Sequence, residues 1–222
     1  RAEAASGLVP PVDDANLINT RAFTRHELFA EARVEATSNS GNKLRTGDAS
    51  DQTRIFPDAQ NVPRPKVPLW RINAVTLHEI PEGPQIAVVI DDAGVDRRRT
   101  QQIIGLPGPL TIAFLTYAQN LKEQVKSASM AGHEIMTHVP MQPKNPRTNP
   151  GKNALQTDLK PVEVKSRLAW ALNRIPSHVG INNHMGSHYT SNETGMQIVM
   201  AELRKRGLLF LDSRTTRETV GA

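Results

Sequence analysis

Short apolar runs alternate with helix-like patterns from residue 84 to the end of the chain. The runs are rich in β-branched residues and predict strands at residues 85–90, 110–115, 134–137, 179–182 and 208–211. Apolar residues at helical spacing predict helices at residues 97–104, 121–131, 161–175 and 193–206. Because strands that alternate with helices are typical of a parallel sheet, we expect an α/β domain over residues 81–222.

Residues 1–80 lack this alternation and are rich in Ala, Asn, Ser, Asp, Thr and Pro. Helix and strand breakers recur at Pro10, Gly41 and Pro63. We therefore expect a mostly irregular linker or partner-docking segment. Within it, apolar residues at loosely helical spacing over residues 21–36 leave two alternatives, a transient helix and an amphipathic helix that docks on a partner.

The composition of the chain narrows these expectations. Only 38% of the 222 residues are apolar and 4% aromatic, which fits a chain that is partly without a core. Because there are 0 Cys, any metal must be held by His, Asp or Glu. The net charge of +5 mildly favours anionic partners. We interpret the runs of basic residues in the chain as solvated helix faces, however, and expect no nucleic-acid partner. No apolar run approaches the roughly 20 residues of a membrane span, and the start at Arg1 is compatible with a leader removed upstream.

Polar residues follow most of the predicted strands. Asp91 and Asp92 follow the first, His138 the third, Asn182, Asn183 and His184 the fourth, and Asp212 and Ser213 the fifth. The carboxyl ends of parallel strands lie at one edge of a sheet, where active sites are found. We therefore expect these side chains to gather although they are far apart in the sequence.

Two adjacent carboxylates repel each other unless a cation or a shared proton neutralises them. Asp92, His138 and His184 offer oxygen and nitrogen ligands for a divalent metal, with a fourth position left for water. Asp91 would then accept a proton from that water, while Asn182 and Asn183 would bind substrate or orient ligands.

Other readings of the same residues stay open. The Asp pair could cap the next helix, and His138 could be a buried histidine bonded to backbone. His188 is an alternative ligand to His184, and His133, beside a glycine, is expected to be structural. Asp212 and Ser213 could contact substrate or tie a loop.

Four blocks in this order resemble the divergent polysaccharide deacetylase family, a branch of the NodB-type carbohydrate deacetylases. They are Ile-Asp-Asp-Ala-Gly ending at Gly94, Gly-His-Glu-Ile-Met-Thr-His-Val-Pro-Met-Gln-Pro ending at Pro143, Asn-Asn-His-Met-Gly-Ser ending at Ser187, and Asp212-Ser213. The resemblance covers about residues 84–222 and rests on the combination, since each block alone is weak.

The resemblance implies a parallel-stranded, distorted (β/α) barrel and a metal-dependent hydrolase, with zinc as the expected ion. Its substrate would be an acetylated polysaccharide of the bacterial cell envelope or periplasm. The family pattern makes Asp91 the general base and Asp92 a metal ligand. Its His-x-x-x-His motif maps onto His138 and Gln142, so we assign the missing ligand to His184.

A second departure from the family pattern lies at the C-terminus. The chain stops soon after the fifth predicted strand, before the family's final strands and Gly-His-Pro motif. We therefore expect an incomplete barrel whose open sheet edge, or residues 1–80, meets a protein partner. These departures keep open a glycan-binding or assembly protein without catalysis, and a metal hydrolase that cleaves another bond.

Overall fold

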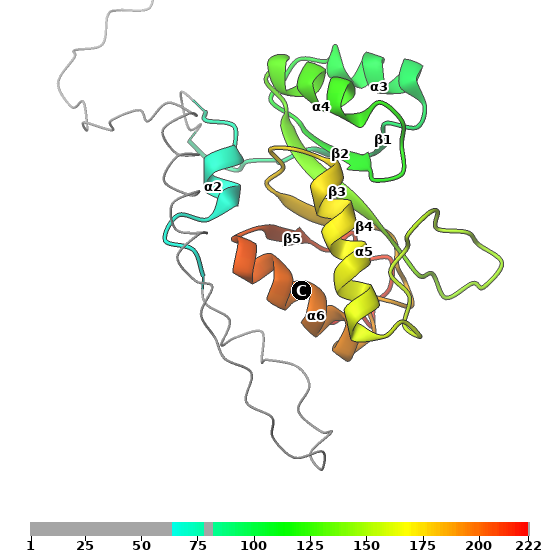
Figure 1. Ribbon diagram of the computed structural model, residues 1–222. Coiled ribbons are helices and arrows are strands. Elements are labelled where there is room, and N and C mark those ends of the chain that lie inside the picture. Colours follow the sequence, from blue (N-terminus) through cyan, green and yellow to red (C-terminus); the bar gives the residue numbers. More distant parts are fainter. Residues whose placement is uncertain (1–63, 78–81, 222) are drawn as a thin grey trace, which may run out of the picture. The chain divides into compact units, whose positions relative to one another are not determined.

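The computed structural model describes residues 64–77 and 82–221 (Figure 1). All of them belong to the unit Gln52–Ala222. Most of the predicted N-terminal segment, including the helical pattern at residues 21–36, lies outside the described residues. Among the residues that are described, no helix has both the length and the apolar character that crossing a membrane requires.

Five parallel strands form one sheet in the order β1-β2-β3-β4-β5, which confirms the predicted α/β fold. The strands are β1 (Val89–Ala93), β2 (Thr111–Leu115), β3 (Glu134–Met141), β4 (Gly180–Met185) and β5 (Leu209–Leu211). The helices between them are α3 (Arg97–Ile104), α4 (Leu121–Met130), α5 (Pro161–Arg174) and α6 (Glu193–Arg206).

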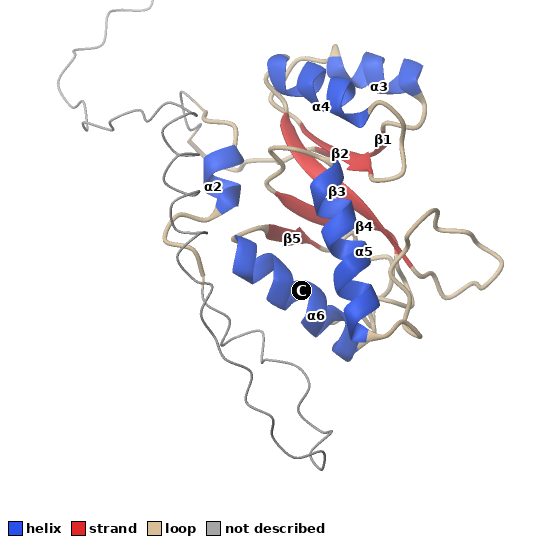
Figure 2. Cartoon of the chain, in the orientation of Figure 1, coloured by secondary structure: helices blue, strands red, loops and turns tan. Residues whose placement is uncertain are grey.

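Helices α3 to α6 cover one face of the sheet. Ile112 of β2 and Ile135 of β3 are paired in register and pack in the core formed with α3 and α4. Val139 and Ile181 lie on the same face and pack against α5 and α6, which are neighbours in Figure 2. A strand order that follows the sequence places successive right-handed crossovers on one side, as in the repeating units of a (β/α) barrel. The opposite face is therefore left for other side chains.

Two strand boundaries differ from the prediction. The first apolar run predicts a strand at residues 85–90, but β1 is Val89–Ala93 and Ile86 is 90% exposed. The third strand continues past Thr137 to Met141, because its extension pairs with β4 and Met141 also bridges to Leu155. Local apolar pattern does not reveal either pairing partner.

The short helix α2 (Leu69–Asn73) packs on the sheet, although its residues fall in the segment expected to be irregular. The Trp70 backbone N–H donates to the Gly207 carbonyl at 3.0 Å, and Asn73 Nδ2 donates to the His178 carbonyl at 2.8 Å. The Trp70 ring joins the cluster that contains Met136. Residues 64–77 thus contact the α/β domain, and the boundary near residue 80 stays a prediction.

His178, whose carbonyl accepts the hydrogen bond from Asn73, should make the free energy of unfolding depend on pH. Burial lowers the pKa of His178, against the opposing effect of its hydrogen bond with the Ile175 carbonyl. The folded pKa lies below the ordinary value of 6.5, so the unfolded chain takes up the proton first as the pH falls. Stability should decrease from about pH 7 downward. His178→Gln should reduce that decrease in urea unfolding at pH 7.5 and 5.5, and an unchanged decrease would contradict it.

Candidate metal centre

An irregularity in β1 brings two adjacent carboxylates to the same face of the sheet. Ile90 pairs with Ile112 and Ala93 with Phe114, so β1 carries one residue more than β2 between these pairs. Adjacent residues of a regular strand point to opposite faces, but a bulge changes where a side chain points. Asp92 also has a φ of 62°, in the left-handed region, where Asp is tolerated better than most residues. Both carboxylates can therefore reach groups on β3 and β4.

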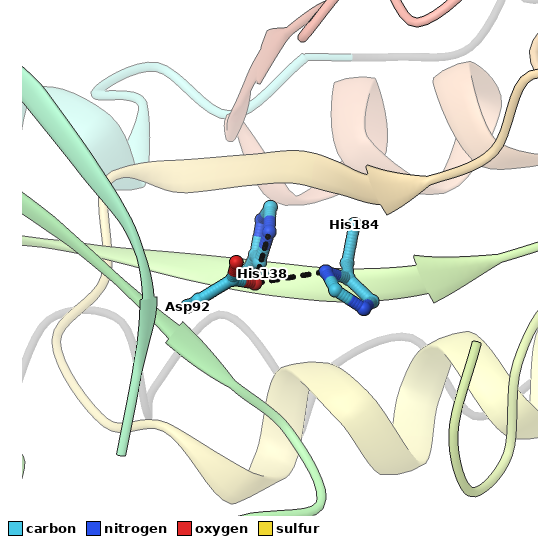
Figure 3. Close-up of side chains that lie close together, drawn as sticks. All are labelled: Asp92, His138 and His184. Atoms are coloured by element: carbon cyan, nitrogen blue, oxygen red, sulfur yellow. Dashed lines mark ion pairs between the residues drawn. The ribbon is translucent and has the colours of Figure 1, made fainter. Parts of the chain in front are cut away.

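His138 on β3 and His184 on β4 both point toward the Asp92 carboxylate of β1 (Figure 3). Asp92 Oδ1 lies 3.3 Å from His138 Nε2 and 2.9 Å from His184 Nδ1. The two imidazole rings are 5.0 Å apart between centroids, at 70° to each other. Asn182 pairs with His138 in register, so His184, two residues further on, faces the same way. This is the face that helices α3 to α6 leave uncovered.

These three side chains form a group that could hold a metal ion. Among the described residues, one ligand atom each from Asp92, His138 and His184 lies within 4.8 Å of the others. The His138 side chain is 3% exposed and that of His184 14%, whereas that of Asp92 is 63% exposed. Solvent therefore reaches the group from the side of Asp92.

Asn182 fixes which nitrogen of His138 carries a hydrogen. The Asp91 carboxylate can only accept, so Asn182 Nδ2 donates to it at 2.7 Å and Asn182 Oδ1 faces His138. That oxygen lies 2.8 Å from His138 Nδ1, which therefore donates. The other ring nitrogen, Nε2, faces an Asp92 oxygen at 3.3 Å. A ring nitrogen and a carboxylate oxygen attract each other only through a cation or proton between them, so this donor set fits a divalent metal.

Charge and burial act on the pKa values of the same group. The hydrogen bond with His138 is the main cause that lowers the pKa of Asp92, against the effect of partial burial. Burial is the main cause that lowers the pKa of His184; His138 lowers it further, and Asp92 opposes. His184 is therefore neutral at pH 7, as metal coordination requires. Its contact with Asp92 is then a hydrogen bond rather than an ion pair.

Gln142, at the position of the second His in the family's motif, holds a loop. Its Oε1 accepts hydrogen bonds from the Thr157 backbone N–H at 2.8 Å and from Thr157 Oγ1 at 3.0 Å. Because β3 remains extended to Met141, residues four apart are separated by roughly 13 Å along the strand. A ligand at position 142 could not share an ion with His138, whereas His184 on β4 can.

The remaining predicted site residues are divided between the site and the nearby loop. Ser213 Oγ lies 3.5 Å from Asn182 Nδ2 and so adjoins the site. The Ser213 backbone N–H donates to Asn183 Oδ1, and Asn183 Nδ2 donates to the Met185 carbonyl. Asp212 accepts from the Arg214 N–H and from Thr219 Oγ1, so it ties the loop after β5. Contact of these residues with substrate stays a prediction.

The other histidines considered from the sequence lie outside the group. His133 is buried, with Nε2 3.0 Å from the Ile104 carbonyl and Nδ1 accepting from the Leu110 N–H. These contacts give it the expected structural role. His188 is exposed and does not join the three clustered residues.

Sequence reasoning missed Tyr117. It follows β2, whose last residue, Leu115, pairs in register with His138, so Tyr117 lies at the same edge of the sheet as the cluster. Burial raises the pKa of its phenol, and the negative charge of Asp92 adds to the rise. One signal was available, since Tyr117 follows β2 as the predicted site residues follow their strands.

A cavity of about 900 Å³ lies away from this chemistry. It is formed by residues 64–70, α6, β5 and Val220, and none of Asp92, His138 and His184 lines it. The site is therefore located by its polar groups on an open face and not by the volume of a pocket.

Asn182→Ala should weaken metal binding, because it removes the acceptor that orients His138. Loss of such a partner costs roughly 10–100-fold in metal affinity, which competition with a chelator measures. Asn183→Ala is the matched control, since Asn183 is equally buried and hydrogen-bonded but does not contact His138. Equal losses in the two variants would assign the effect to general destabilisation.

Comparison with known proteins identifies the family of this chain. The family model described as divergent polysaccharide deacetylase matches residues 88–222. The chain is 39% identical over 137 residues to the uncharacterized protein YibQ of Escherichia coli (strain K12), covering 61% of this chain and 42% of YibQ. It is 31% identical over 136 residues to an uncharacterized protein of Haemophilus influenzae, covering 61% of this chain and 48% of that one. It thus spans less than half the length of these curated relatives.

A solved structure has a similar fold. The uncharacterized protein ATU2773 from Agrobacterium tumefaciens C58 superposes with a TM-score of 0.66 at 26% identity. The match covers 69% of this chain and 63% of that chain. The α/β arrangement around the site is therefore shared with a protein whose structure was determined by crystallography.

Proposed function

The chain belongs to the divergent polysaccharide deacetylase family, and we propose that it is a metal-dependent hydrolase that removes acetyl groups from an envelope polysaccharide. Asp92, His138 and His184 would hold the metal. Two imidazoles and one carboxylate suit zinc, which keeps an open position in catalytic sites. The observation that carries the proposal is the cluster of one carboxylate and two imidazoles, in which one ligand atom each from Asp92, His138 and His184 lies within 4.8 Å of the others.

The residues around the metal ligands suit hydrolysis of an acyl group. A zinc ion lowers the pKa of a bound water to roughly 7 and polarises a carbonyl oxygen. Asp91 is the proton acceptor for the attacking water, because it lies beside Asp92 but is not one of the three clustered ligands. The Asn182 amide holds one Asp91 oxygen, which fixes the carboxylate and leaves its other oxygen for the proton.

Zinc analysis and acetate release test this function together. The purified protein should bind about one zinc ion per chain, and the loaded protein should release acetate from acetylated glycans. Addition of a chelator should stop the release, and zinc should restore it. A chain that binds no divalent metal at micromolar concentrations would exclude the proposal.

A glycan-binding or assembly protein without catalysis is the second candidate. It is favoured by Gln142, which stands where the family's motif has its second metal-binding His and instead accepts hydrogen bonds from Thr157. Binding of glycan by the zinc-loaded protein without acetate release would support this candidate.

The location and the partners belong to the same proposal. We propose the periplasm or cell envelope as the location, because an acetylated envelope polysaccharide would be found there. A protein partner could use residues 1–80 or the sheet edge at β5, where Leu209 and Leu211 are 41% and 40% exposed. An unpaired strand at a sheet edge readily pairs with another chain.

A further inference from the structure

Tyr117 lies at the end of the strand between the two that bear Asp92 and His138. Strand β2 lies between β1 and β3, and Tyr117 comes two residues after its last residue, Leu115. Leu115 pairs in register with His138, so this end of β2 lies at the same edge of the sheet as the proposed metal ligands. Burial raises the pKa of the phenol, and the negative charge of Asp92 adds to the rise. The hydroxyl therefore keeps its proton at neutral pH and can donate it in a hydrogen bond.

The backbone on both sides of Tyr117 is held in place. Arg174 Nε donates to the Thr116 carbonyl at 3.1 Å, and Arg174 Nη2 donates to the Ala118 carbonyl at 2.8 Å. Gly94, two residues after Asp92, packs so closely on this turn that a Cβ added to it would lie 2.8 Å from the Ala118 Cβ. The turn that carries the phenol is thus fixed against the loop that follows Asp92.

The long loop after β3 supports the Tyr117 ring. A Cβ added to Gly151 would lie 2.8 Å from Tyr117 Cδ1 and 2.9 Å from Cζ, so the glycine backbone lies against the ring. Gly151 also has a φ of 103°, which disfavours any other residue. The ring is only partly buried, and among the described residues its hydroxyl has no hydrogen-bond partner. A rigidly supported donor at the sheet edge that bears the proposed metal ligands is thus left for a substrate.

We propose that the Tyr117 hydroxyl donates a hydrogen bond to the carbonyl oxygen of the acyl group that is hydrolysed. This inference rests on the proposed function and names the acyl group as what the phenol recognises. The donor would stabilise the negative charge that develops on this oxygen, the kind of interaction that often contributes most to acyl transfer.

The electron and proton movements are those of hydrolysis. The water oxygen bonds to the acyl carbon, a water proton passes to Asp91, and the carbonyl electron pair moves onto the oxygen that Tyr117 holds. When the C–N or C–O bond to the sugar breaks, this pair forms the carbonyl again. The proton on Asp91 then passes to the departing amine or hydroxyl, and acetic acid is the other product.

Tyr117→Phe separates the hydroxyl from the ring, since phenylalanine can still pack on Gly151. The zinc-loaded variant should keep its metal, while kcat for acetate release falls about 10²–10³-fold with KM little changed. In calorimetric titration with acetate ion, its affinity should be about 5- to 10-fold weaker than that of the wild type. Tyr189→Phe is the matched control, because the other tyrosine of the chain donates to the Gly195 carbonyl inside the core.

The outcomes distinguish this inference from the proposed function. Wild-type kcat and acetate affinity in zinc-loaded Tyr117→Phe would overturn the role of the hydroxyl and leave the metal site standing. A wild type that binds no zinc would overturn both. If the wild type binds zinc but releases no acetate, hydrolysis fails as the function, and the acetate titration still decides whether Tyr117 binds an acyl oxygen.

Discussion

Asp92→Asn is expected to abolish zinc binding at concentrations that saturate the wild-type protein. Asparagine preserves the shape of the side chain and tolerates the left-handed backbone at this position, so the fold should be retained. The substitution places a neutral amide where His138 Nε2 and His184 Nδ1 meet a carboxylate. The affinity should fall by more than the roughly 10–100-fold that loss of a supporting residue costs.

The measurement compares zinc-dependent stability in the two proteins. Free zinc at 100 times its dissociation constant stabilises a folded protein by about 2.7 kcal/mol, and Asp92→Asn should lose this gain. Asp96→Asn is the control, since Asp96 is an exposed carboxylate that caps α3 outside the cluster. Equal zinc stabilisation in Asp92→Asn and the wild type would show that Asp92 is not a ligand.

The clustering of Asp92, His138 and His184 could be predicted because it depends on topology. Once residues 134–137 and 179–182 are recognised as parallel strands, His138 and His184 must emerge at the same edge of the sheet. Asp92 joins them by the same argument. Three residues from distant parts of the chain thus meet for a reason that is visible in the alternation of strands and helices.

The orientation of the carboxylates could not be predicted, because it depends on register. The extra residue in β1 is defined only by its pairing with β2. It allows the side chains of Asp91 and Asp92 to lie on the same face of the sheet. The hydrogen bonds between Gln142 and Thr157 could not be predicted either, because Thr157 lies in a loop without a periodic pattern. Such features arise from contacts between segments and leave no local signal.

Asn182 connects the two chemical roles of the site. One amide group binds the proposed base, Asp91, through Nδ2 and the proposed ligand, His138, through Oδ1. Because an amide cannot exchange its two ends without losing both bonds, the orientation of the base and the tautomer of the ligand are fixed together. Metal affinity and catalysis should therefore both decrease on changes at Asn182 or Asp92, whereas a change at Asp91 should lower catalysis alone.

Asp91→Asn, unlike Asp92→Asn, should keep its zinc but lose catalysis. The new amide oxygen can still accept the hydrogen bond from Asn182 Nδ2, so the site should keep its structure and its zinc. It cannot take a proton from water, and loss of a general base lowers kcat by about 10²–10⁴-fold. Acetate release and zinc content are measured on the same samples. A variant that hydrolyses at the wild-type rate would remove Asp91 from the mechanism, whereas one that loses its zinc would make Asp91 a ligand.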